Sequence, residues 1–223
     1  EKIHLKEDFH REGILERGRK MKYMKYYNFD IELIKKSVAA AILISFGVCI
    51  NLTIGGITGA ILFSFGLLGV CALKLNLFTG KAGYIFDSKE NKKEILPIII
   101  TNLIAGWLFG ATLSGFNPTL IAIAAAKVTI LTPSISLFFG AFFCGMIMYL
   151  AVEMYKRNKS CLGIIFGIPL FILCGFYHTV AIVIMAGMAF VILNPFVLLI
   201  CTFGNIMGSL FIKYLCGNAV DKS

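Results

Sequence analysis

The stretch ILCGFYHTVAIV, residues 172 to 183, places an imidazole in one of the most apolar parts of the sequence. His178 is the only histidine outside the N-terminal segment, and it follows Gly175, which favours a helix break. An imidazole can donate or accept a hydrogen bond and can exchange a proton. Two interpretations stay open. His178 serves a polar pathway, or it is a buried histidine whose hydrogen bonds the fold satisfies.

A second polar interruption, ALKLNLFTGKAG at residues 72 to 83, lies in another apolar segment and contains Lys74, Thr79 and Lys81. No acidic residue shares the apolar segments with these basic groups, whereas a cation pathway normally contains Asp or Glu. The interruption therefore favours an anion as the species that passes. The alternative for Lys74 and Lys81 is that each extends its ammonium group to a membrane interface.

The composition indicates that membrane-spanning helices position these polar groups. The chain has 223 residues, of which 58% are hydrophobic and 15% charged, whereas soluble domains have roughly 25% charged residues. Lipid offers no partner for unpaired backbone groups, so the apolar segments are predicted to be helices. We predict an all-α membrane protein with six transmembrane helices. They cover residues 37 to 50, 57 to 86, 95 to 114, 135 to 155, 161 to 190 and 196 to 215.

The second and fifth of these segments are each longer than the roughly 20 residues that one crossing needs. These two segments also contain the polar interruptions. Because they are corresponding members of two three-helix halves with opposite orientations, we predict an inverted 3+3 repeat with broken helices 2 and 5. Paired broken helices are typical of transport sites, where the N-terminal ends of half-helices can face an anion.

The positions of Lys and Arg predict the orientation. Basic residues fill the N-terminal segment and the links after the second and fourth spans, whereas the other three links contain only Lys127. Positive links lie on the cytoplasmic side, so both termini are predicted to be cytoplasmic in a multi-pass protein of the inner (cell) membrane. The net charge of +9 follows mostly from this bias, and no nucleic-acid partner is needed to explain it.

The chain is predicted to have three parts. Residues 1 to 30 combine apolar and charged residues, which predicts an amphipathic helix, either at the inner membrane interface or packed on a neighbouring subunit. Residues 31 to 216 form the predicted transmembrane domain, and residues 217 to 223 a cytoplasmic tail.

The seven cysteines are scattered without a C-x-x-C pair, so we interpret them as packing residues and expect neither a metal site nor a cofactor.

Four short motifs, in this order, resemble those of the formate/nitrite transporter family: LFTG at 77 to 80, YLAVEMY at 149 to 155, GFYH at 175 to 178 and FGNIMG at 203 to 208. The resemblance covers nearly the whole chain. It implies an aquaporin-like protomer, a homopentamer in the lipid bilayer, and a pore for small monovalent anions in each protomer.

The resemblance also implies roles for individual residues. His178 matches the family's central histidine, Thr79 its loop threonine, and Lys127 the basic residue of its external approach. The constricting apolar residues match Phe63, Leu67, Phe78 and Phe171. Polar partners of the family's pore are replaced, which leaves room for hydrosulfide beside formate and nitrite; the replacements are Tyr177, Ile182, Gly145 and Lys81.

The pattern favours one of three classes of function. The preferred one is a channel that passes small monovalent anions of the formate, nitrite or hydrosulfide class. The alternative is an aquaporin-like channel for a small neutral solute, which the dipeptides at 117 to 118 and 194 to 195 suggest, although both lie in predicted external links. An intramembrane enzyme is not expected, because no aligned nucleophile and base, paired carboxylates or metal-ligand set accompanies His178.

Overall fold

The computed structural model describes residues 31–216, and all regular elements within this range are helices. The predicted N-terminal helix at 1 to 30 and the tail at 217 to 223 lie outside the described residues. Four helices are long and apolar enough to cross a membrane, namely Ile31–Ile54, α4 (Lys89–Phe116), α6 (Ile135–Asn158) and α9 (Pro195–Cys216). The shorter elements are α2 (Gly56–Ala72), α3 (Phe78–Lys81), η1 (Ala82–Tyr84), α5 (Thr119–Val128), α7 (Leu162–Leu173) and α8 (Thr179–Met188).

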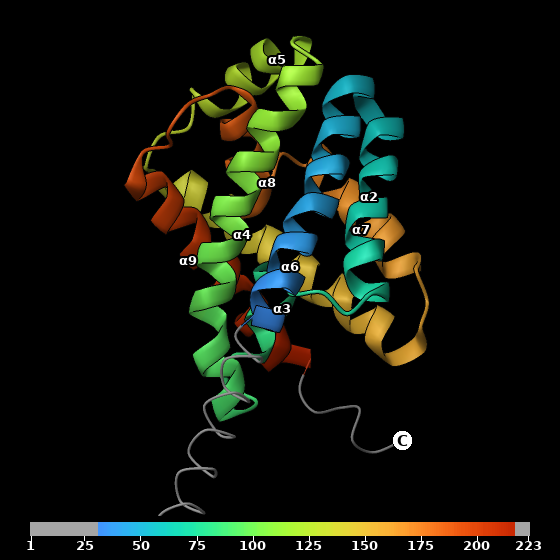
Figure 1. Ribbon diagram of the computed structural model, residues 1–223. Coiled ribbons are helices and arrows are strands. Elements are labelled where there is room, and N and C mark those ends of the chain that lie inside the picture. Colours follow the sequence, from blue (N-terminus) through green and yellow to red (C-terminus); the bar gives the residue numbers. More distant parts are fainter. Residues whose placement is uncertain (1–30, 217–223) are drawn as a thin grey trace, which may run out of the picture.

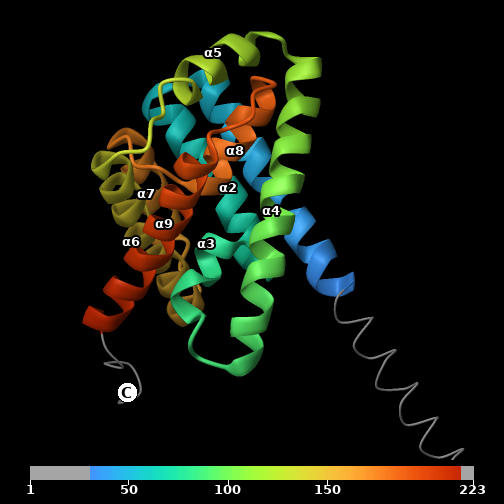
Figure 2. The same ribbon diagram turned by 90° about the vertical axis from the view of Figure 1, so that its left-hand side faces the viewer.

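The helices form a bundle in which the long helices run along its height (Figure 1). The helix α6 packs on α9, α4 packs on α8, and α2 packs on α7. The short helix α5 lies across one end of the bundle, whereas α3 lies toward the other (Figure 2). The first described helix begins, and α9 ends, at the same end as α3. The described chain therefore enters and leaves the bundle at one end.

Glycines allow the closest helix contacts. A Cβ atom at Gly208 of α9 would overlap the carbonyl group of Phe142 on α6, and one at Gly187 of α8 would overlap that of Trp107 on α4. Small residues at such crossings let two backbones approach, which is a common basis of helix packing in membranes.

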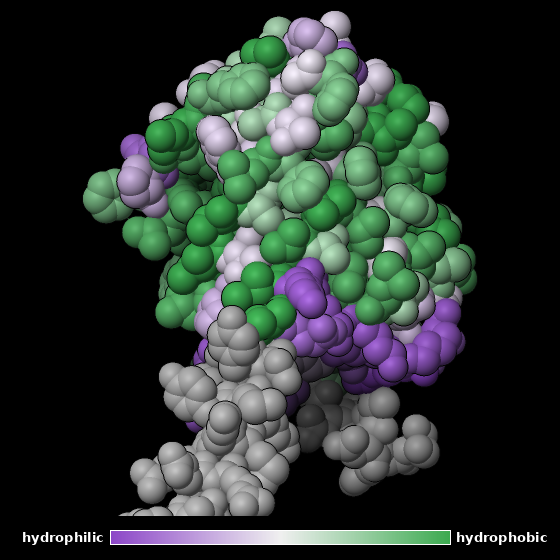
Figure 3. Space-filling model, viewed as in Figure 1, coloured by the Kyte–Doolittle hydropathy of each residue, from purple (hydrophilic) through white to green (hydrophobic). Residues whose placement is uncertain are grey.

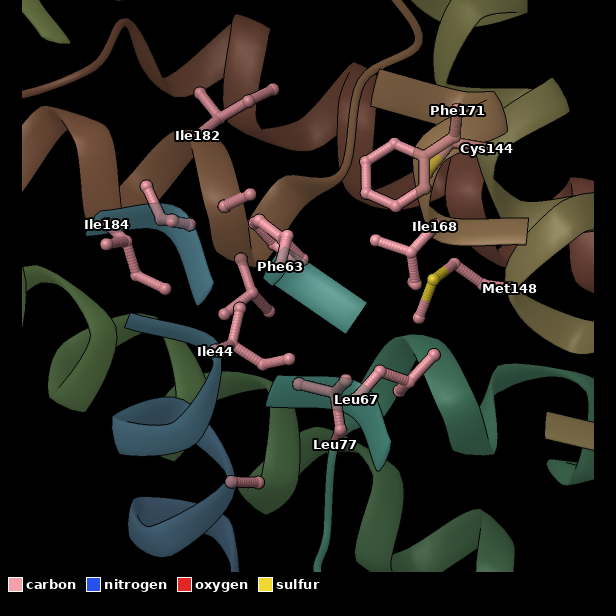
Figure 4. Packing of buried hydrophobic residues seen from close by; sticks show 14 of the residues in the cluster. Ile44, Phe63, Leu67, Leu77, Cys144, Met148, Ile168, Phe171, Ile182 and Ile184 are labelled. Atoms are coloured by element: carbon pink, nitrogen blue, oxygen red, sulfur yellow. The ribbon is translucent and has the colours of Figure 1, made fainter. Parts of the chain in front are cut away.

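The bundle has an apolar interior and an apolar exterior. Phe63 of α2, Ile44 of the first helix and Phe171 of α7 meet in the buried cluster (Figure 4). Large apolar side chains such as Phe65, Phe166 and Phe203 are also exposed on the outside. Figure 3 shows apolar side chains over most of one face and hydrophilic side chains gathered at the end where the described chain begins. An exterior of this kind matches a lipid environment rather than water.

The helices differ from the predicted segments in two respects. The segment between the third and fourth spans, predicted to be a link, contains the helix α5, which packs on α8. Its ten residues extend about 15 Å, too short to cross a bilayer, so the length of the apolar run does not predict it as a crossing. The long helices also extend beyond their apolar parts; α4 begins at Lys89 because Ser88 caps it by accepting a hydrogen bond from the backbone N–H of Asn91.

Candidate functional site

Both predicted breaks are present, and they have the same backbone construction. The helix α2 ends at Ala72, and the N–H of Leu75 then donates to the carbonyl of Val70 at 2.9 Å. The helix α7 ends at Leu173, and the N–H of Phe176 donates to the carbonyl of Phe171, also at 2.9 Å. Both turns close a helix with one residue in the left-handed region.

The left-handed residue differs between the two breaks. It is Lys74 in the first, with φ 53°, and Gly175 in the second, with φ 70°. Three non-helical residues follow in each case, the last of them extended (Leu77 or His178), before the next helix begins at Phe78 for α3 and at Thr179 for α8. The chain thus leaves the helix for a few residues in the middle of the bundle and then resumes it.

Asn102 of α4 holds the first break. Its Oδ1 accepts a hydrogen bond from the N–H of Phe78 at 2.9 Å. Its Nδ2 donates to the carbonyls of Asn76 at 3.0 Å and of Ser37, on the first helix, at 2.8 Å. The side chain is fully buried, so these bonds replace water for the otherwise unpaired groups of the break.

Asn205 of α9 holds the second break in the same way. Its Oδ1 accepts from the N–H of Thr179 at 3.0 Å and from the hydroxyl of Thr179 at 2.8 Å. Its Nδ2 donates to the carbonyls of Tyr177 at 2.8 Å and of Ala141, on α6, at 2.7 Å. We call the two buried amides, Asn102 and Asn205, the asparagine anchors.

The backbone determines the tautomer of His178. His178 is the N-cap of α8, and its Nδ1 accepts a hydrogen bond from the N–H of Ala181 at 3.1 Å. A backbone N–H can only donate, so Nδ1 carries no proton in this arrangement and the neutral ring carries its proton on Nε2. The Nε2–H group faces Thr79, whose Oγ1 lies 2.8 Å away.

The Thr79 and His178 pair lies in an apolar surrounding. His178 is 2% exposed and Thr79 is 0% exposed. The imidazole stacks on the ring of Phe171, with centroids 5.8 Å apart and planes inclined by 25°. Phe63 meets Phe171 edge to face with centroids 6.1 Å apart. The two polar groups therefore meet beside a pair of phenyl rings.

A cavity of about 290 Å³ opens on the α5 side of the pair. Its lining includes Phe63, Phe171, Tyr177 and His178, together with Lys127 of α5. We call it the outer cavity. Among the described residues that line the outer cavity, Lys127 is the only charged one.

A second cavity, of about 370 Å³, lies on the other side. Its lining includes Asn76 and Leu77 of the first break and four lysines, Lys74, Lys81, Lys156 and Lys159. We call it the inner cavity. Leu67, Phe78 and Thr79 are buried and line neither cavity.

The predicted site residues thus fall in three places. His178 is in contact with Thr79 and lines the outer cavity with Lys127, Phe63 and Phe171. Lys74 and Lys81 line the inner cavity. The third group, Leu67, Phe78 and Thr79, is buried and lines neither cavity. Asn205 belongs to the motif at 203 to 208, but neither asparagine anchor had a role predicted from the sequence, and Lys156 and Lys159 were predicted only to lie in a cytoplasmic link. A signal for the anchors was available, because a lone amide in an apolar helix needs a buried partner.

Gly145 is one of the residues that the resemblance gives as replacements of polar partners in the family's pore. The structure places Gly145 against the backbone of Asn205, where a Cβ atom would overlap the Asn205 carbonyl. The position therefore serves the contact between α6 and α9.

No protein-family model and no curated protein matches the sequence. Solved structures do match the fold. A structure described as "FNT family ion channel" aligns with a TM-score of 0.74 at 21% identity, covering 87% of this chain and 92% of that chain. Another, described as "Pentameric formate channel with formate bound", aligns with a TM-score of 0.66 at 18% identity, covering 85% of this chain and 96% of that chain. The chain therefore has the fold of formate/nitrite transporter channels, as the sequence motifs implied.

Proposed function

We propose that this protein is a channel for small monovalent anions, with the pore running through each protomer from the outer cavity to the inner cavity. The observation that carries the proposal is the hydrogen bond between Thr79 and His178, which lies between two cavities lined by lysines. The shared fold with a formate channel supports the same function.

The protomer is proposed to have six crossings in an inverted 3+3 repeat. Four are single long helices, and two are the broken pairs α2 with α3 and α7 with α8. The equivalent construction of the two breaks and the two asparagine anchors supports this repeat. Such a repeat brings both breaks to the centre, where a substrate site is expected.

The donors that meet the anion are proposed to be side chains. The N–H groups of Thr179 and Ala181 at the start of α8 already bind Asn205 and His178, so they are not free to bind an anion. The Nε2–H of His178 donates to Oγ1 of Thr79, and the Thr79 hydroxyl keeps its own proton, so an anion that enters between the two side chains can exchange their mutual bond for one from each. These two bonds offset part of the cost of desolvating the ion between the two cavities.

The geometry favours hydrogen bonding over proton transfer from His178. Because Nδ1 caps α8, the ring has one proton, on Nε2. Donating that proton to the anion would leave an imidazolate, which a neutral apolar surrounding does not stabilise. We therefore propose that the anion passes while hydrogen-bonded, with Phe63, Leu67, Phe78 and Phe171 excluding larger species.

The substrate class is formate, nitrite or hydrosulfide, and the assembly a homopentamer in the cell membrane. The description of the matching structure as a pentameric formate channel supports formate as a candidate and the pentamer. Tyr177, where the family motif has a glutamate, removes an acid from the lining of the outer cavity. The absence of this negative charge favours the entry of small anions in general and does not distinguish among formate, nitrite and hydrosulfide.

Flux into phosphatidylcholine vesicles tests the proposal. Purified protein is reconstituted, and the uptake of formate, nitrite, hydrosulfide and chloride is compared with the swelling caused by a neutral solute such as glycerol. We expect uptake of at least one of the first three, well above protein-free vesicles, and little swelling with glycerol. Swelling without anion uptake would instead support the aquaporin-like alternative.

Both termini are proposed to be cytoplasmic, with the inner cavity on the same side. In a variant without its natural cysteines, single cysteines at Lys92 and Lys159 are expected to react only with a thiol reagent applied from the cytoplasm. Reaction of both from outside would reverse the topology.

A further inference from the structure

The inner cavity is lined by more lysines than the outer cavity. Among its described lining residues are four lysines and no carboxylate, whereas the outer cavity has Lys127 alone. Lys81 is paired, at 3.4 Å, with Glu94, which lies outside the lining. Within residues 31–216, no carboxylate lies within salt-bridge distance of the other three lysines, Lys74, Lys156 and Lys159.

Aromatic rings hold two of these lysines in place. The ammonium group of Lys156 lies 3.2 Å from the ring centroid of Tyr84, and that of Lys159 lies 5.9 Å from the ring centroid of Tyr155. The Tyr84 hydroxyl in turn donates to the carboxylate of Glu153. A cation over a ring face keeps its charge and its remaining N–H donors, so both lysines can still bind an anion.

The backbone at Lys74 gives independent support. Lys74 has φ 53°, a conformation that is strained for a side chain other than glycine, and the equivalent residue of the second break is Gly175. The first break therefore contains a lysine where glycine would be easier to accommodate. A charge at the cavity wall explains that choice.

We propose that the inner cavity is a binding site for a divalent oxyanion of the sulfate or phosphate class, which blocks the pore from this side. The inference rests on the proposed conduction of monovalent anions. Each lysine attracts a divalent ion twice as strongly as a monovalent one, and about 370 Å³ leaves room for a tetrahedral oxyanion with water.

The same ion does not cross. The cost of moving an ion into an apolar medium rises with the square of its charge, so a divalent ion faces about four times the cost of a monovalent ion at Phe78 and Leu67. Thr79 and His178 offer two donors there, too few to replace its water. The divalent ion therefore binds in the inner cavity without crossing the constriction, and it blocks the pore for monovalent anions.

Sulfate is the probe for the test. Binding of sodium sulfate to the purified protein is measured by titration calorimetry, with sodium chloride at equal ionic strength as the reference. Inhibition of formate, nitrite or hydrosulfide flux is measured in vesicles of phosphatidylcholine alone, so that no anionic lipid headgroup takes part. We expect saturable sulfate binding and inhibition by sulfate that reaches the inner cavity.

The double variant Lys156→Gln with Lys159→Gln is compared with Lys92→Gln. Lys92 also lies over an aromatic ring, 5.1 Å from the centroid of Phe86, but outside the cavity lining. We expect the double variant to bind sulfate about tenfold more weakly and Lys92→Gln to bind it like the wild type.

Three results would overturn the inference: no sulfate binding, equal sulfate affinity in the wild type and the double variant, or transport of sulfate through the protein. If the wild type conducts none of the three monovalent anions, the proposed function fails. Calorimetry then still decides whether the inner cavity binds sulfate. In vesicles that contain phosphatidic acid, sulfate inhibition as strong as in phosphatidylcholine alone supports a soluble ligand, whereas complete loss of the inhibition would assign the site to the lipid phosphate and overturn the proposal.

Discussion

Thr79 and His178 are joined by a hydrogen bond of 2.8 Å between Oγ1 and Nε2, although they lie in different halves of the chain. The opposite edge of the imidazole, Nδ1, caps the first turn of α8. One side chain thus performs a structural task with one nitrogen and presents a donor with the other. Substitutions can separate these two tasks.

Replacing His178 by Asn should remove the donor but keep the cap, because Asn is a good N-cap residue and its shorter side chain does not reach Thr79. We expect a folded protein whose anion flux is reduced at least about tenfold, the loss that one hydrogen bond to a charged group entails. Uptake in vesicles measures the flux, and thermal unfolding in detergent checks the fold.

His178→Ala should remove both the N-cap of α8 and the hydrogen-bond donor to the anion. We expect the same loss of flux together with a free energy of unfolding lower than that of His178→Asn by about 1 kcal/mol, the usual contribution of an N-cap. Wild-type flux in His178→Asn for every anion tested would show that His178 is a packing residue.

The asparagine anchors should dominate the stability of the two breaks. Asn205→Ala removes four hydrogen bonds and leaves buried groups of Thr179, Ala141 and Tyr177 without their partner. We expect a loss of more than about 3 kcal/mol, since each unsatisfied buried group costs about 1 to 3 kcal/mol. Thermal unfolding measures the loss.

Asn158→Ala, at the exposed end of α6, is the matched control and should change the stability by less than about 0.5 kcal/mol. Asn102→Ala should resemble Asn205→Ala, because its three bonds have equivalent partners. Unfolding temperatures of both anchor variants equal to that of the control would refute this assignment.

Phe171 should contribute to size selection. Its ring contacts Phe63 and His178 at the floor of the outer cavity, so Phe171→Ala enlarges the passage there. We expect higher uptake of a larger monocarboxylate, such as lactate, relative to formate. Phe166→Ala is the control, because Phe166 is exposed on the outside of the same helix. An unchanged lactate to formate ratio in Phe171→Ala would remove this residue from the constriction.

Lys74→Gly should affect stability and binding in opposite directions. Glycine adopts the left-handed conformation without strain, so we expect the free energy of unfolding to rise by up to about 1 kcal/mol, although the unfolded chain gains entropy. The loss of one charge from the inner cavity should weaken sulfate binding. Unfolding curves and calorimetry on the same preparation measure both effects. A less stable protein with unchanged sulfate affinity would contradict both expectations.

The sequence by itself determined that the helices lie in lipid and that two of them are broken. Long apolar runs without acids predict helices in lipid, because unpaired backbone groups are too costly there. Polar residues in the middle of two such runs predicted the breaks near Lys74 and Gly175, and both are present. His178 and Thr79 stood out for the same reason. These features depend on residues close together along the chain.

Only the tertiary structure decided which groups meet. The anchors Asn102 and Asn205 bind carbonyls on Ser37 and Ala141, more than sixty residues away in each case. The proton on His178 is placed by the N–H of Ala181, and the inner cavity draws Lys74 and Lys81 from one half of the chain and Lys156 and Lys159 from the other. Periodicity along the chain does not encode which helix faces touch, because packing in the bundle fixes those distances through space.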